Sequence, residues 1–151
     1  MAMEQEYIFL KLGDIKGTST TSTNKDQIVL QNMSYGISQA GQWEDGDRLS
    51  GRITNFSDLS CVKLLDMSSP SLATACALKT QIPKAEIAVT SGTKEAYYTL
   101  TLESVIITSI STSISAGEAH PSESFTLSFR KGQWSYGTAK GGYDLAKNEK
   151  V

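Results

Sequence analysis

The segment from Ala85 to Ser115 constrains the fold most, because its apolar residues recur at every second position. Successive side chains of a strand leave opposite faces of a sheet, so this spacing predicts β-strands. A Ser-Gly-Thr step at residues 91–93 interrupts the alternation and predicts a turn, which makes the segment a long β-hairpin. The residues expected to point inward are Ala85, Ile87, Val89, Tyr98, Leu100, Leu102, Ile106, Ile110 and Ile114.

The second strand of this hairpin is too long to run straight. Residues 98–114 would span roughly 55 Å at about 3.3 Å per residue, which a compact domain does not easily hold. Ser104 and Thr108 interrupt the apolar row, so we expect a bend or bulge at these two positions.

The opposite face of the same strand is mostly hydroxylated, but Val105 and Ile107 are apolar. One interpretation is ordinary β-propensity on a solvated face. The other is a strand covered on both faces, by a helix or by a partner. Two β-branched neighbours left in water favour aggregation, so we assign Val105 and Ile107 to a subunit interface.

Composition supports one folded, strand-rich domain over residues 1–151, long enough to bury a core without metals or disulfides. The net charge of −2 gives no overall attraction to nucleic acid or anionic lipid. No apolar run is long enough for a membrane span, and residues 1–6 lack the basic and apolar regions of a secretory signal. We therefore expect Cys61 and Cys76 to be free, buried thiols in a reducing compartment.

Only one helix is expected. It runs from Pro70 to about Leu78, with Ser69 as its cap, and packs through Leu72 and Cys76. Elsewhere alternation predicts strands, with a change of parity near Gln31 that indicates a bulge. These strands are expected at residues 7–12, 27–39, 53–65, 124–130 and 134–136.

Residues 40–52 carry three glycines and five charges and predict a long extended loop. Its charged residues and two apolar anchors suit ordering against a partner surface. Asp45-Gly46-Asp47 lacks the further acidic ligands of a calcium loop. The residues assigned here to contact with a partner are Trp43, Glu44, Asp45, Asp47, Arg48 and Leu49.

The sequence shows no pattern typical of catalysis. His120 is the sole histidine and has no nucleophile elbow nearby. Glu86, Glu95 and Glu103 lie in or beside the hairpin, where contact with solvent or a partner is favoured over a glycosidase pair. No phosphate loop, dinucleotide fingerprint or metal spacing occurs, so we expect no enzyme, cofactor or metal.

Several blocks, taken in order, resemble one known family: the haemolysin-coregulated protein (Hcp) family, which forms the tube of bacterial type VI secretion systems. Residues 40–52 and 116–122 show no matching pattern. The blocks that carry the resemblance are Tyr7–Gly17, Met33–Gln39, Asp58–Ser60, Leu65–Leu72 with Ala75-Cys76, and Gly142–Asn148.

The resemblance implies a mainly β fold, a barrel of two packed antiparallel sheets with one flanking helix. It also implies homo-hexameric rings that stack into a hollow tube and carry small effector proteins in the lumen. With rings as the partner, we expect residues 40–52 to mediate contact between stacked rings. The implied partners are the sheath and spike proteins of the apparatus, with no nucleic acid and no membrane. The protein would be cytoplasmic before firing, then secreted without a signal peptide to the extracellular space or into target cells.

Two alternatives remain open. One is a stand-alone β-sandwich that binds carbohydrate through Trp43 and Trp134. The other is a small hydrolase built around His120. Size-exclusion mass separates both from a ring-forming tube subunit.

Overall fold

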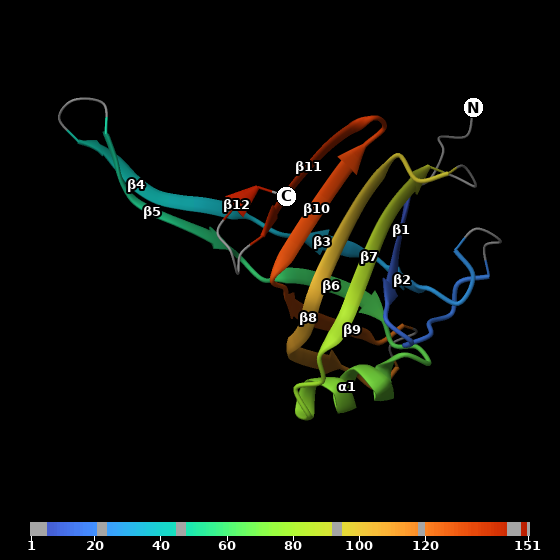
Figure 1. The fold of residues 1–151 in the computed structure, drawn as a ribbon. Helices are drawn as coiled ribbons and strands as arrows, with labels where there is room; N and C mark the ends of the chain where they lie inside the picture. The colour runs from blue at the N-terminus through green and yellow to red at the C-terminus, as the bar shows by residue number, and fades with distance from the viewer. Residues whose placement is uncertain are drawn as a thin grey trace.

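The structure is a computed structural model that describes residues 6–20, 24–44, 48–91, 95–117, 120–144 and 149–150 (Figure 1). Of residues 6, 39–44, 48–55 and 149 it describes the backbone alone. The elements are β1 (Glu6–Leu12), β2 (Ile28–Leu30), β3 (Asn32–Ser34), β4 (Ile37–Glu44), β5 (Arg48–Phe56), β6 (Leu59–Leu64), α1 (Ser69–Ala77), β7 (Ile82–Ser91), β8 (Tyr98–Ser113), β9 (Ser122–Ser128), β10 (Lys131–Tyr136), β11 (Ala139–Asp144) and β12 (Glu149–Lys150).

The strands form a barrel of two antiparallel sheets, which confirms the predicted fold class. One sheet has the order β12-β11-β10-β8-β7-β1-β2, and the other joins β3, β6, β9 and β8. The first half of β8 pairs with β7 and β10, and its second half pairs with β9. On the opposite side the chain leaves the first sheet at β2 and enters the second at β3, with the predicted irregularity at Gln31 between them. These two crossings close the barrel around a single core.

The bend in β8 lies where the sequence predicts it. Ser104 adopts a φ of 55°, in the left-handed region, and the pairing with β9 shifts register between Ile107 and Ser109. A residue in this conformation interrupts the pleat, so the side chains that follow change face. The inward row therefore switches at Ser104 from even to odd positions.

This switch contradicts the assignment of Val105 and Ile107 to a subunit interface. Their side chains are 0% and 2% exposed and belong to the core of the barrel. Ile106 is only half-buried and Ile114 is 64% exposed, although both were predicted to point inward, whereas Ile110 packs against the core as predicted. The prediction carried one parity through the bend, whereas Ser104 reverses it for Val105 and Ile107. The register shift between Ile107 and Ser109 then reverses it again, so that Ile110 pairs with the buried Phe125.

The helix α1 closes one end of the barrel (Figure 1) and lies within one residue of its predicted bounds. Leu72 is fully buried in the core and Cys76 packs against it, as predicted. Ser68 is the N-cap residue in place of Ser69, and its side chain makes no capping hydrogen bond. The Ser68 hydroxyl instead donates to Asp66.

Both cysteines are free thiols, as predicted. Cys61 lies on β6 and is fully buried, whereas Cys76 is only half-buried, so the prediction of two buried thiols holds for Cys61 alone. Burial raises the pKa of the Cys61 thiol to about 12, which keeps it protonated and unreactive at neutral pH.

The predicted extended loop at residues 40–52 is instead a two-stranded hairpin made of β4 and β5. We call this hairpin the arm. It projects away from the barrel (Figure 1), and its two strands pair with each other and with no other strand in the described part of the chain. Two further strands, β11 and β12, lie in the Gly- and Lys-rich tail, where no strand was predicted.

Candidate functional site

The arm carries the residues that the sequence analysis assigned to contact with a partner. In the backbone register, Trp43 pairs with Leu49 and Glu44 pairs with Arg48, so the four lie together at the outer end of the arm. Asp45 and Asp47, of the same assignment, lie outside the described residues. The arm therefore presents two apolar and two charged positions far from the barrel.

At the base of the arm, Phe56 joins it to the outer strands of the large sheet through three aromatic neighbours. The Phe56 ring meets Phe129 edge-on at 5.7 Å between centroids and stacks on Tyr143 of β11, also at 5.7 Å. It is tilted against Trp134 of β10 at 6.4 Å. Edge-to-face and offset-stacked pairs at 4.5–7 Å are favourable geometries for aromatic rings. This cluster fixes the point where β5 returns to the barrel.

The other strand of the arm is held by a tyrosine pair. Tyr35 lies two residues before the arm, and its hydroxyl lies 2.7 Å from the hydroxyl of Tyr98 on β8. Burial and this hydrogen bond raise the pKa of Tyr98 to about 12, so Tyr98 stays neutral through the physiological range. Between the two strands, the Gly36 N–H donates to Ser57 Oγ at 2.7 Å, and the Ser57 N–H donates to the Gly36 carbonyl at 2.9 Å.

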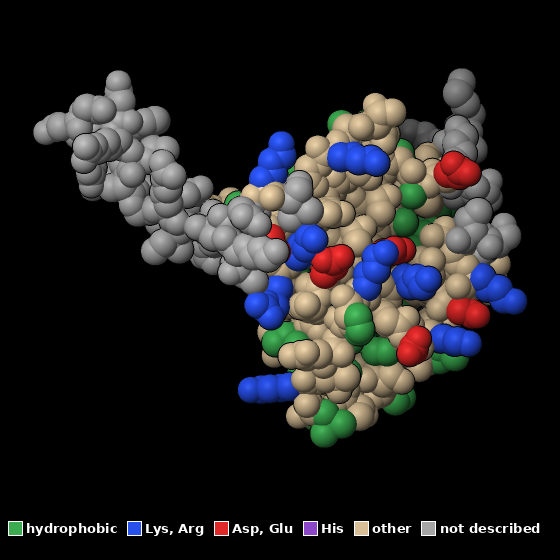
Figure 2. Space-filling view, viewed as in Figure 1, with side chains coloured by type: hydrophobic (Ala, Val, Ile, Leu, Met, Phe, Trp, Pro, Cys, Tyr) green, Lys and Arg blue, Asp and Glu red, His purple; other side chains and the backbone are tan. Residues whose placement is uncertain are grey.

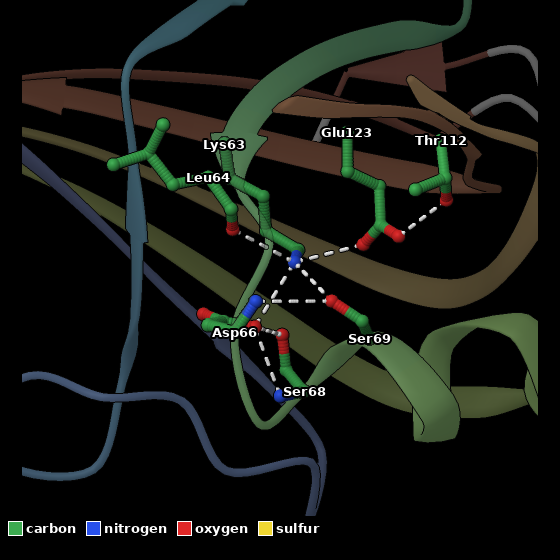
Figure 3. Close-up of polar contacts among 7 residues, drawn as sticks. All are labelled: Lys63, Leu64, Asp66, Ser68, Ser69, Thr112 and Glu123. Atoms are coloured by element: carbon green, nitrogen blue, oxygen red, sulfur yellow. Dashed lines mark hydrogen bonds and ion pairs between the residues drawn. The ribbon is translucent and has the colours of Figure 1, made fainter. Parts of the chain in front are cut away.

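A second cluster of interacting side chains lies inside the barrel and is built around a buried lysine (Figure 3). Lys63 of β6 is 0% exposed. Its Nζ lies 2.8 Å from Glu123 Oε1 on β9 and 3.0 Å from Asp66 Oδ1. It also donates to Ser69 Oγ, at the start of α1, at 3.0 Å. The ammonium thus links β6 and β9 to the beginning of the helix.

Every charge in this cluster is paired. Burial alone would raise the pKa of Glu123, but hydrogen bonds from Lys63, Thr112 and Ser69, with the Lys63 charge, outweigh it and hold that pKa below its ordinary value. Thr112 of β8 donates to Glu123 Oε2 at 2.7 Å. Asp66 accepts from the Ser68 N–H at 2.9 Å. The cluster therefore fastens α1 to the barrel.

The other candidate residues considered above lie apart from this cluster, on or near the outer surface. Charges of both signs are interspersed on the face shown in Figure 2. Glu86 and Glu103, considered above as carboxylate candidates, form exposed ion pairs with Lys84 at 2.9 Å and Lys131 at 3.4 Å. Exposed pairs of this kind add little stability. His120 is exposed. Trp134, the candidate sugar-stacking residue, is half-buried against Phe56.

No group of three His, Cys, Asp or Glu side chains in the described part of the chain has the arrangement of a metal site. The one helix described here is too short and too polar to span a membrane.

The sequence analysis missed both the lysine cluster and the anchoring of the arm. A signal for the first was present: Lys63 shares its parity with Leu59 and Cys61, and Glu123 shares its parity with Phe125. Opposite charges on the inward positions of two strands indicate a buried pair when those strands are neighbours. No local signal placed Phe56 beside Tyr143, because their contact depends on tertiary folding.

These features define a closed β-barrel with one helix at one end of the barrel and one projecting hairpin. A family model described as "Type VI secretion system effector, Hcp" matches residues 9–136. Protein hcp1 of Pseudomonas aeruginosa is 32% identical over 132 residues, which cover 85% of this chain and 82% of the relative. The chain belongs to the Hcp family of the type VI secretion system, and this family is not a known enzyme family.

Solved structures agree with this assignment. Hcp1 from Salmonella typhimurium is 28% identical, with a TM-score of 0.85 over 97% of this chain and 99% of the other. Hcp2 from Salmonella typhimurium is 26% identical, with a TM-score of 0.75 over 95% of this chain and 98% of the other. The predicted family is therefore confirmed.

Proposed function

We propose that residues 1–151 form one tube domain, that this domain assembles into homo-hexameric rings, and that the rings stack into the conduit of a type VI secretion system. The observation in this chain that supports the proposal most is that the arm projects from the barrel without a third strand beside it among the described residues. Its two strands pair only with each other among the described residues. An isolated two-stranded hairpin is marginally stable in water, so a second copy of the chain is a suitable surface to complete it.

The proposed contacts between stacked rings are the residues at the outer end of the arm. Trp43 and Leu49 supply apolar anchors, and Glu44 and Arg48 supply one charge of each sign at paired backbone positions. Asp45 and Asp47 complete the proposed set. Aromatic and arginine residues are enriched where binding energy concentrates at protein interfaces, which favours Trp43 and Arg48 as the main contributors.

The remaining assignments follow from the proposed tube. The partners are copies of the chain itself, the sheath and spike proteins of the apparatus, and small effector proteins in the lumen. The protein is cytoplasmic until the apparatus fires, and is then released outside the cell or into a target cell without a signal peptide. Val105 and Ile107 take no part in assembly, because they lie in the core of the barrel.

Deleting residues 44–49 tests the role of the arm. The deletion removes the outer end of the hairpin and leaves the barrel core untouched. We expect thermal stability and ring mass close to those of the parent, with stacked rings and secretion lost. Thermal melting, sedimentation, electron microscopy and a secretion assay measure these four properties.

A matched control removes the same kinds of charge elsewhere. The double substitution Lys84→Ser with Glu86→Ser deletes an exposed ion pair on the barrel and should leave stacking intact. The double substitution Glu44→Ser with Arg48→Ser should weaken stacking. Loss of the folded barrel in the deletion, or unchanged stacking, would contradict the proposed role.

A further inference from the structure

We propose that the side chains at the base of the arm act as an anchor that fixes its direction. The arm is then already oriented for binding when it meets a second copy of this chain. The anchor consists of Tyr35, Phe56, Trp134 and Tyr143, with Phe129 and Tyr98 as supports. The proposal rests on the proposed function for its partner, and names residues that position the contact without making it.

The geometry of Phe56 is the first support. One ring contacts three others that come from β10, β11 and the segment between β9 and β10. Neighbours on several sides restrict the side chain to one orientation, because a rotation that improves one ring contact breaks another. The end of β5 is therefore fixed against the large sheet.

Two glycines supply the space that the cluster needs. Gly141 pairs directly with Trp134 across β10 and β11, and a Cβ at Gly141 would lie 2.9 Å from the Trp134 ring nitrogen. A Cβ at Gly132 would lie 3.1 Å from Phe129. Aromatic rings that lie over strand glycines stabilise such positions. The missing side chains at Gly132 and Gly141 thus leave room for the rings, in addition to the contacts that the rings make with one another.

The second strand of the arm is fixed independently. Tyr35 is bonded to Tyr98 of β8, and the paired bonds between Gly36 and Ser57 tie the two strands of the base together. Each strand is therefore held where it leaves the barrel. Two separate attachment points define a direction, whereas one attachment point would allow the arm to swing.

Direction matters because the arm is long and is unsupported by other strands among the described residues. The eight residues of β4 span about 26 Å at roughly 3.3 Å each. A swing of about 20° at the base would then displace the outer end by about 9 Å, on the same strand geometry. Such a displacement exceeds the tolerance of a specific interface. A fixed base lowers the entropic cost of docking, because the arm has less conformational freedom to lose when it binds.

The test combines a distance measurement with an assembly measurement. Spin labels are placed at Gln42→Cys on the arm and Ser111→Cys on the barrel, in a Cys76→Ser background that leaves only the buried Cys61. Labelled chains are diluted into unlabelled chains of the same anchor variant, so that each ring carries at most one. Double electron–electron resonance then measures the distance between the two labels, which depends on the direction of the arm. Electron microscopy shows whether the rings stack.

We expect a single narrow distance distribution in the parent. Phe56→Ala should broaden it and reduce stacked rings at least tenfold, while the chain stays folded and the ring mass remains that of the parent. Phe56→Tyr should restore both properties, because it keeps the ring. Tyr7→Ala is the matched control: it removes an aromatic pair with Phe9 on β1, away from the arm, and should change neither measurement.

A broad distribution in the parent, or an unchanged distribution and unchanged stacking in Phe56→Ala, would overturn the anchor. If Phe56→Ala does not fold, Gly141→Ala takes its place, because the added Cβ would press on the Trp134 ring, and the same outcomes apply. Failure of the proposed function gives a different result. In that case the variant that lacks residues 44–49 stacks to the same extent as the parent, while the distance distribution still shows whether the base of the arm is fixed.

Discussion

Replacing Lys63 with methionine is expected to lower the free energy of unfolding by about 3–5 kcal/mol. Methionine keeps much of the length of the side chain but removes the ammonium. Glu123, which is 3% exposed, would then be a buried carboxylate whose Oε1 lies 2.8 Å from where that cation had been. Chemical denaturation of both proteins measures the difference.

Removing Lys63 and Glu123 together separates the stability that their ion pair contributes from the cost of leaving one partner buried alone. A buried ion pair replaced on both sides by apolar residues is often neutral in stability. Lys63→Met combined with Glu123→Leu should therefore recover part of the loss, since Asp66 keeps its bonds from Ser68 but still lacks the cation 3.0 Å away. A double variant as unstable as Lys63→Met, or a single variant as stable as the parent, would contradict this account of the cluster.

The same cluster predicts a dependence on acid. The pKa of Glu123 is lower in the folded protein than in the unfolded chain, so its contribution to stability is present above the ordinary carboxyl pKa. That contribution is lost as the pH falls through the lower, folded value. Glu123→Gln should therefore lose less stability than the parent over this acid range.

Ile107→Asp is expected to prevent folding altogether. The side chain is 2% exposed in the core, so the substitution buries a carboxylate with no cation beside it. We expect a loss of more than about 4 kcal/mol, in the range that only core disruption reaches. Circular dichroism and sedimentation should show an unfolded or aggregated chain.

The control is Ser111→Asp, on the same strand beyond the bend. Ser111 is exposed, so the same charge should change stability by less than about 0.5 kcal/mol. Folded monomers of Ile107→Asp would contradict the core assignment. They would support the subunit interface at Val105 and Ile107 that the sequence alone predicted.

The strand pattern and the helix could be predicted from the sequence because each depends on local periodicity. The bend at Ser104 was also visible as an interruption of the apolar row. Its consequence was not, because alternation says that a bulge exists but does not say how many residues change face. The misplaced interface at Val105 and Ile107 follows from that one ambiguity.

The arm illustrates a second limit of the sequence. Its glycines and charges indicated a loop, because neither strand has an apolar face to bury against the barrel. Pairing between the two strands and the aromatic contacts at their base depend on residues distant in the chain, such as Tyr143. The assignment of its outer end to contact with a partner remains a prediction that the deletion tests.

Sedimentation of the purified chain, with electron microscopy of the same sample, tests the central claim most directly. We predict a particle with the mass of six chains that appears as a ring with an open centre. A folded particle with the mass of one chain at every concentration examined would contradict the tube assignment.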